Sequence, residues 1–186
     1  YTTLFRSDNV VVPEEARLGD EGSGFRLAMV TMDEARVNIA CCALGAAAAA
    51  VEEAVRYSRE RKQFGKPIIE HQGLGFIIAD LVTGLANVRA LVSNAVQALE
   101  SGRNRRPGIY AAMAKQAATD FAMDAAVKAA QVLGGYGLTR SYVVARLIRD
   151  CKALQIFEGT NEIQKWIISR EVAKNGLDIL EMDDLL

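Results

Sequence analysis

The chain has few of the residues from which metal sites and disulfide frameworks are built. Its 186 residues include three cysteines and one histidine. Cys41 and Cys42 are adjacent, which excludes the CxxC spacing of zinc and redox sites, and with Cys151 they are too few for a disulfide framework. We expect all three to be small buried side chains in a reducing compartment. His71 has no histidine or cysteine partner at ligand spacing, which favours a structural role over metal binding.

Net charge and long hydrophobic runs are also limited. The chain has 22 basic and 23 acidic residues, a formal net charge of −1, whereas phosphate binding needs a concentrated basic face. The longest apolar run, residues 39–51, is mostly alanine and is too short and too weakly hydrophobic for a membrane span. Nothing resembles a signal peptide. We therefore expect neither nucleic acid nor a membrane span.

The first seven residues are unusual for the start of a protein. Permitted codons for Tyr1–Ser7 spell the end of a common sequencing-library adapter. We therefore expect residues 1–7 to be non-native and exclude them from reasoning about the fold.

The remaining sequence predicts an all-α fold. Asp8–Val12 ends in three valines before Pro13 and is expected to be a short β-strand remnant. From Phe25 onward apolar residues recur at helical spacing, and Trp166 is expected to pack among them. The predicted helices are 25–60, 72–100, 109–133, 141–155 and 160–173, with a basic loop at 61–67. Short connections between long amphipathic helices indicate an antiparallel helical bundle.

Three segments together resemble the acyl-CoA dehydrogenase family: Arg61–Gly65, Gln131–Gly137 and Ile156–Gln164. The resemblance extends over essentially the whole chain after Ser7. It implies the carboxy-terminal helical domain of that family, which follows an amino-terminal helical domain and a central β-domain. On this basis residues 8–21 are the end of the β-domain, residues 22–175 the helical bundle, and residues 176–186 a loosely held tail.

By this resemblance, Glu158 is the base that removes the α-proton of an acyl-CoA thioester. Abstraction of that weakly acidic proton requires a carboxylate beside the carbon and donors on the carbonyl oxygen. Gly159, which has no side chain, permits close approach of the thioester. Some members carry the base on the first long helix instead, but Ala35 occupies that place here. The alternative for Glu158 is an ordinary solvated glutamate before a helix.

Two further residues resemble the family's contacts with the CoA part of the substrate. Asp33 and Arg36 lie three residues apart on the first helix. Arginine is suited to phosphate or adenine contact through its planar, multi-donor head. An i,i+3 surface ion pair explains the spacing equally well.

Three groups resemble FAD contacts, and each has a simpler alternative. Arg61, Gln63 and Phe64 resemble a loop that reaches the FAD of a neighbouring subunit, or they form a solvated helix end. A second group resembles another turn on that partner's FAD, or it is a glycine C-cap; it comprises Gln131, Val132, Leu133, Gly134 and Gly135. Thr160 and Glu162 begin a helix whose free N–H groups suit a flavin edge or a phosphate, or Thr160 is only an N-cap.

The resemblance implies FAD-dependent α,β-dehydrogenation of acyl-CoA to trans-2-enoyl-CoA. Its implied partners are an electron-transfer flavoprotein and other copies of the chain, most simply in a homotetramer. The implied location is a bacterial cytoplasm or a mitochondrial matrix. Alternatives are an acyl-CoA oxidase or another flavoenzyme of the superfamily, or a non-enzymatic helical interaction module. The chain alone is expected to be inactive and unable to hold FAD.

Overall fold

The computed structural model describes residues 6–101 and 106–180. Residues 1–5 of the predicted non-native segment and residues 181–186 of the predicted tail lie outside this part. Contacts divide the chain into two units, residues 1–31 and 32–186, which are considered separately.

The first unit contains little regular structure. It includes the 3-10 helix η1 (Glu14–Ala16) and the first residues of helix α1 (Gly24–Glu60). Residues 8–12 form no strand, in contrast to the prediction, and Val10, Val11 and Val12 are exposed. A strand requires a neighbouring strand to satisfy its N–H and C=O groups, and the described residues of this unit provide none. The assignment of residues 8–21 to a β-domain stays a prediction.

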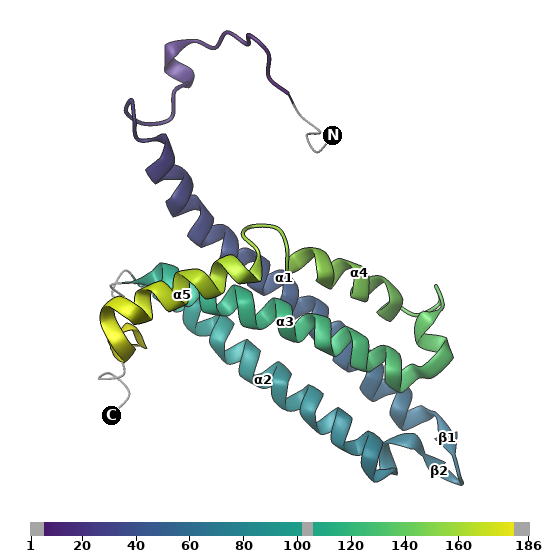
Figure 1. Ribbon diagram of the computed structural model, residues 1–186. Helices are drawn as coiled ribbons and strands as arrows, with labels where there is room; N and C mark the ends of the chain where they lie inside the picture. The colour runs from purple at the N-terminus through teal and green to yellow at the C-terminus, as the bar shows by residue number, and fades with distance from the viewer. Residues whose placement is uncertain (1–5, 102–105, 181–186) are drawn as a thin grey trace. The chain divides into compact units, whose positions relative to one another are not determined.

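The second unit is a bundle of long helices, as predicted (Figure 1). After α1, a tight hairpin and the 3-10 helix η2 turn the chain into α2, which runs antiparallel to α1 (Figure 1). The elements that follow α1 are β1 (Lys62–Gln63), β2 (Lys66–Pro67), η2 (Ile68–Glu70), α2 (Gln72–Glu100), α3 (Pro107–Leu133), η3 (Gly134–Leu138), α4 (Val144–Leu154), α5 (Asn161–Asn175) and η4 (Gly176–Leu180). The five predicted helices are confirmed to within about three residues at each end, and the predicted loop at 61–67 contains the hairpin.

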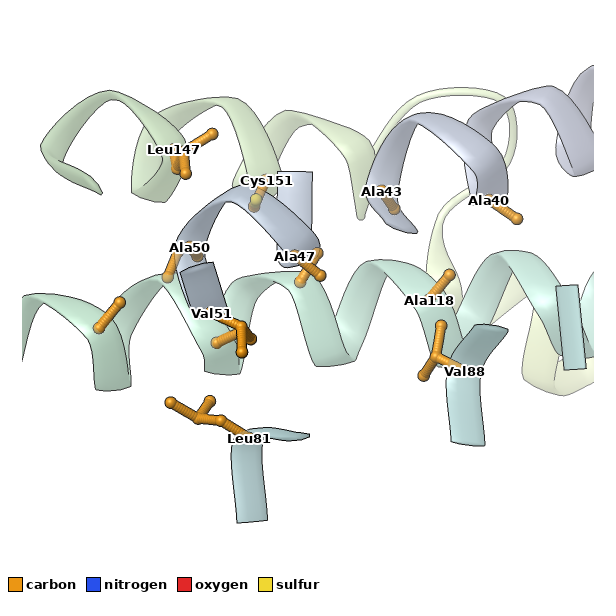
Figure 2. Packing of buried hydrophobic residues seen from close by; sticks show 14 of the residues in the cluster. Ala40, Ala43, Ala47, Ala50, Val51, Leu81, Val88, Ala118, Leu147 and Cys151 are labelled. Carbon is orange, nitrogen blue, oxygen red and sulfur yellow. The ribbon is translucent and has the colours of Figure 1, made fainter. Parts of the chain in front are cut away.

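Helix α3 is the centre of the bundle, because it packs against α2, α4 and α5 and shares the core with α1. Small side chains let the helices approach closely (Figure 2). Ala43, Ala47 and Ala50 of α1 and Ala118 of α3 are fully buried. The alanines of α1 recur every three or four residues, which places them on one helix face.

Glycine has the same role between α2 and α3. A Cβ atom added to Gly84 would lie 2.2 Å from the ring of Phe121. Leu81 and Val88, one turn to either side of Gly84, are buried in the core. The contact between α2 and α3 therefore depends on the absence of a side chain at position 84.

Several sequence expectations about individual side chains are corrected. Cys151 is buried, but Cys41 and Cys42 are exposed because they lie on the outer face of α1. Trp166 is 56% exposed, with the Arg170 guanidinium 5.3 Å from its ring centroid. Residues 176–180, at the start of the predicted tail, form η4, and Ile179 is buried.

The apolar run 39–51 is by itself too short to span a membrane, but α1 and α2 are each longer than that run and contain apolar stretches. By length and composition α1 and α2 each satisfy the criterion for crossing a membrane, which core helices of soluble proteins satisfy as well. Both contribute residues to the core of the bundle.

Candidate functional site

The turn between α4 and α5 carries the predicted base in a strained backbone conformation. Glu158 has φ +54° and Gly159 has φ +86°. For a residue with a Cβ atom, the left-handed region costs about 1–2 kcal/mol. Such a conformation persists only where the surrounding structure imposes it. Glu158 is partly exposed, so its side chain is held at the surface of the bundle by the turn beneath it.

Two buried side chains hold this turn through one carbonyl oxygen. The Nζ atom of Lys115 on α3 donates a hydrogen bond to the Gly159 oxygen at 2.9 Å. The Nε2 atom of Gln164 on α5 donates to the same oxygen, also at 2.9 Å. Lys115 and Gln164 are both fully buried. The peptide between Gly159 and Thr160, one residue beyond Glu158, is therefore fixed from two helices.

Asn161, the first residue of α5, ties the turn to the same face of α3. Its Oδ1 atom accepts hydrogen bonds from Lys115 Nζ at 2.8 Å and from Thr119 Oγ1 at 3.1 Å. Its Nδ2 atom donates to Asp120 Oδ1 at 2.7 Å. Both ends of the amide are thus used, which fixes the position of the start of α5 relative to α3.

Burial is the main influence on the pKa of Lys115 and lowers it below the ordinary value. The carboxylates of Asp120, Glu162 and Glu158 oppose this effect, in decreasing order, because each favours the ammonium form. The ammonium group is therefore electrostatically coupled to the predicted base as well as hydrogen-bonded to its turn.

Asp120 is held as a carboxylate by its neighbours. Burial alone would raise its pKa, but hydrogen bonds donated by Gln116, Asn161 and Gln155 outweigh this and keep the pKa below its ordinary value. The polar face of α3 therefore presents a stable negative charge to the start of α5.

Thr160 is the N-cap of α5, as one of the two interpretations predicted. Its hydroxyl oxygen accepts a hydrogen bond from the Ile163 N–H at 3.4 Å. Glu162, in the first turn, has a lowered pKa because its own backbone N–H and the Thr160 hydroxyl favour the carboxylate. A cavity of about 110 Å³ opens beside this helix start. Its lining residues are Asp120, Lys152, Gln155, Ile156, Thr160, Asn161, Glu162 and Lys165.

Asp33 and Arg36 form an ion pair, but not on an open surface. Arg36 Nη1 donates to Asp33 Oδ1 at 2.6 Å, and Arg36 is only 9% exposed. Its Nε atom is buried and has no hydrogen-bond partner among the described residues. Burial raises the pKa of Asp33, and the opposing effect of Arg36 is smaller.

The pair lines a second cavity, of about 270 Å³, which is larger than the one beside the start of α5. The other lining residues are Arg106, Gly108, Ile109, Ile167 and Glu171. A Cβ atom at Gly108 would lie 2.7 Å from Asp33 Oδ2, so α3 begins directly against this carboxylate. Glu158 lines neither this cavity nor the smaller one.

The hairpin residues predicted to contact a cofactor are exposed. Phe64 has φ +52° and is 93% exposed. Its ring and the ring of His71 meet edge to face, with 5.8 Å between their centroids. His71 Nε2 lies 3.1 Å from the Gln63 carbonyl oxygen, in hydrogen-bonding distance. The structural role expected for His71 is compatible with this contact and stays a prediction. Arg61 extends into solvent beside them.

The second predicted cofactor segment forms the end of α3. Gly134 is the C-cap, with φ +61°, as the simpler alternative predicted. Gln131, Gly134 and Gly135 are exposed. Val132 and Leu133 are buried in the core.

These two segments lie at the same end of the bundle, away from Glu158. Tyr57, one turn before the end of α1, lies 6.3 Å from Tyr136 of η3 and 6.1 Å from Tyr142, measured between ring centroids. Along α3, the sixteen residues between Lys115 and Gln131 correspond to about 24 Å. The structure thus brings the predicted residues into separate groups rather than into one site.

The sequence analysis missed the polar residues that support the Glu158 turn. They are Lys115, Gln116, Thr119 and Asp120 on α3, with Asn161 and Gln164 on α5. The four on α3 follow helical spacing within an otherwise alanine-rich segment. A polar stripe on a helix that must be buried is a signal that another polar element packs against it.

Comparison with known proteins supports the family resemblance. Residues 22–173 match the protein family described as acyl-CoA dehydrogenase, C-terminal domain. The chain is 48% identical over 169 residues to an acyl-CoA dehydrogenase of Bacillus subtilis, covering 91% of this chain and 44% of that protein.

Solved structures agree with the sequence match. Butyryl-CoA dehydrogenase from Megasphaera elsdenii has a TM-score of 0.84 at 42% identity, over 87% of this chain and 42% of that chain. The structure of PigA with FAD and proline has a TM-score of 0.85 at 27% identity, over 91% of this chain and 44% of that chain. The chain thus spans about two fifths of the length of the relatives it matches. It belongs to the acyl-CoA dehydrogenase family, and the part that matches is the C-terminal domain.

Proposed function

We propose that this chain is the carboxy-terminal part of an FAD-dependent enzyme that oxidises acyl-CoA thioesters to trans-2-enoyl-CoA. The observation that carries the proposal is the Glu158 turn. The backbone of Glu158 is in the left-handed region, and the carbonyl oxygen of the next residue accepts hydrogen bonds from two buried side chains. A solvated glutamate before a helix needs no such support. Relatives named for acyl-CoA and butyryl-CoA oxidation and one with bound FAD support the substrate class and the cofactor.

In this proposal Glu158 takes the proton from the α-carbon of the thioester. Gly159 has no side chain, and an added Cβ would lie 2.7 Å from the buried Gln164 Nε2, so the glycine permits the tight turn on which the thioester would approach. The backbone N–H of Glu158 donates a hydrogen bond to the thioester carbonyl, which stabilises the negative charge that develops as the proton leaves. A bound FAD would supply the acceptor for the hydride that leaves the β-carbon.

The residues at the start of α5 suit part of that cofactor. Thr160 and Glu162 border a cavity with two lysines, Lys152 and Lys165, at a helix amino terminus. The lining also includes the carboxylates of Asp120 and Glu162, and the N–H groups of Asn161 and Ile163 already have partners in the chain. We therefore propose that the side chains of this cavity, rather than free N–H groups, would contact the polar edge of a flavin.

The separate groups on one chain support a cofactor shared between chains. Arg61, Gln63 and Phe64 of the hairpin and the exposed Gln131, Gly134 and Gly135 are available to the FAD of a neighbouring copy, and the buried Val132 and Leu133 would support that second segment from the core. Phe64 is almost fully exposed, which is costly for an aromatic side chain unless a partner covers it. We therefore propose a homo-oligomer, most simply a tetramer, and an inactive isolated chain.

The larger cavity suits the CoA part of the substrate. The guanidinium of Arg36 has a buried Nε atom with no hydrogen-bond partner in the described chain, which a phosphate or adenine acceptor would satisfy. Asp33 orients this guanidinium through their ion pair.

We further propose that electrons pass from the reduced cofactor to an electron-transfer flavoprotein, and that the enzyme is cytoplasmic in a bacterium. An acyl-CoA oxidase with the same bundle is the alternative within the superfamily. Anaerobic reduction by acyl-CoA followed by exposure to oxygen separates the two, because an oxidase is reoxidised rapidly by oxygen alone.

The proposal is tested by replacing Glu158 in the full-length protein. Glu158→Gln keeps the shape of the side chain but removes the base, so acyl-CoA should bind without bleaching the flavin absorbance. Glu52→Gln, at an exposed position on α1, is the matched control and should be reduced at the wild-type rate. Rapid reduction of the Glu158→Gln protein would contradict the proposal, and so would absence of bound flavin from the wild type.

A further inference from the structure

Lys115 is a fully buried lysine in the alanine-rich helix α3. Ala111, Ala114 and Ala118 surround it along the helix and are also fully buried. A buried ammonium group is costly unless its N–H groups are satisfied. A lysine at this position therefore needs an explanation beyond packing.

The hydrogen bonds of Lys115 lead to the Glu158 turn. Its Nζ atom donates to the oxygen of Gly159 at 2.9 Å and to Asn161 Oδ1 at 2.8 Å, so it bridges the two ends of a three-residue segment. Gln164 donates to the same Gly159 oxygen, and its Oε1 atom is buried without a partner among the described residues. The orientation of the Gln164 side chain is therefore set by the hydrogen bond that its Nε2 atom donates to the Gly159 oxygen.

These contacts act on the residue next to Glu158. The Gly159 carbonyl is directed into the bundle by two donors, which fixes the peptide between Gly159 and Thr160. Gln164 Nε2 also donates to the Glu158 oxygen at 3.4 Å, and this oxygen belongs to the peptide immediately after the strained Glu158 backbone. Reorientation of the turn would break these hydrogen bonds, so together they hold Glu158 in the left-handed region.

We propose that Lys115, assisted by Gln164, is a positioning residue that sets the direction of the Glu158 carboxylate by holding the Gly159 carbonyl from inside the bundle. It does not touch the substrate. This inference rests on the proposed role of Glu158 as the base.

The first test measures the reductive half-reaction of the full-length, FAD-loaded protein with butyryl-CoA. In Lys115→Met the limiting rate of flavin reduction per bound flavin should fall about 10- to 100-fold, since small misplacement of a reacting group has effects of this size. The dissociation constant for butyryl-CoA, read from the flavin spectrum, should stay within about threefold of wild type, because direct substrate contacts are retained. A purely structural lysine would reduce the yield of folded, flavin-bound protein but not the rate per flavin.

Two further variants complete the design. Lys128→Met removes a lysine from the same helix, one paired with Asp124 at the surface, and should reduce flavin at the wild-type rate. Gln164→Met removes the second donor without removing a charge, and should slow reduction less than Lys115→Met does. If Lys115→Met does not fold, the rate of flavin reduction in Gln164→Met decides whether the Gly159 carbonyl contacts position Glu158. A wild-type rate per flavin in either folded variant overturns the inference.

A second measurement does not depend on activity. Hydrogen–deuterium exchange in residues 156–161 should be faster in Lys115→Met than in Lys128→Met, with exchange in α2 unchanged. Unchanged exchange in the turn overturns the positioning role. A wild type that butyryl-CoA and other acyl-CoA thioesters fail to reduce would instead count against the proposed function, and the exchange result would still decide whether Lys115 holds the turn.

Discussion

Replacing Gly159 with alanine tests whether the Glu158 turn is as constrained as its contacts indicate. At φ +86° an alanine costs about 1–2 kcal/mol from backbone strain alone. The added Cβ would lie 2.7 Å from Gln164 Nε2, so the buried glutamine must move and lose its hydrogen bond to the turn. A lost hydrogen bond adds about 0.5–1.5 kcal/mol. The expected total is about 2–3 kcal/mol.

Gly65→Ala provides the matched comparison. Gly65 has φ +82°, but nothing lies within 4 Å of an added Cβ, so only the strain remains. For domains of this size 1 kcal/mol corresponds to roughly 2–4 °C in the unfolding midpoint. By calorimetry of the full-length protein, Gly159→Ala should therefore melt roughly 5–10 °C below wild type and Gly65→Ala only about half as far below it. Flavin reduction by acyl-CoA should also be slowed in Gly159→Ala. Equal midpoints for the two variants together with a normal reduction rate would refute the reasoning.

Gly84→Ala should destabilise the protein by about 1–3 kcal/mol, because the added methyl group overlaps the Phe121 ring. Gly45→Ala should stabilise it by up to about 1 kcal/mol, because this helix position has open space around it. Urea unfolding measures both changes. The lowered pKa of Asp120 means that its carboxylate contributes stability above the ordinary value of 3.8 and that this contribution is lost as the pH falls through the lowered pKa. In Asp120→Asn that part of the acid dependence should be missing from unfolding midpoints measured between about pH 2 and pH 6, and an unchanged profile would contradict the assignment. Phe64→Ala should leave the unfolding midpoint of the flavin-free protein unchanged, since the side chain is 93% exposed, but should weaken FAD retention on gel filtration; undiminished retention would remove Phe64 from the cofactor site.

The helices could be predicted from sequence because their signals are local. The apolar residues of α2 recur at helical spacing, and Gly134 at the end of α3 is a common terminator. The strand expected at residues 8–12 depended on a partner strand that the described chain does not supply. The hairpin at 62–67 was missed because each of its strands is only two residues long, too short for an alternating pattern to be recognised.

The candidate site was predictable in its residues but not in its support. Glu158 was identified from a family motif, and nothing in the local sequence indicates its left-handed backbone. The contacts that hold it join Lys115 to residues more than forty positions later, a separation that periodicity cannot reveal. The position of Trp166 was wrong for a related reason, because a large aromatic residue in an amphipathic helix need not be on the buried face.

The alanine-lined contact between α1 and α3 has a consequence for how such a protein can change over evolution. Alanines at positions 47 and 50 of α1, and at position 118 of α3, are fully buried, so a replacement of the size of valine or larger would overpack the core and push the helices apart. Such a movement would carry Lys115 with α3 and alter the turn that it supports, even though the replaced residue lies well away from any ligand. Adaptation to new acyl groups is therefore expected to proceed through the exposed residues of the turn and of α5, while these interhelical positions remain restricted to the smallest side chains.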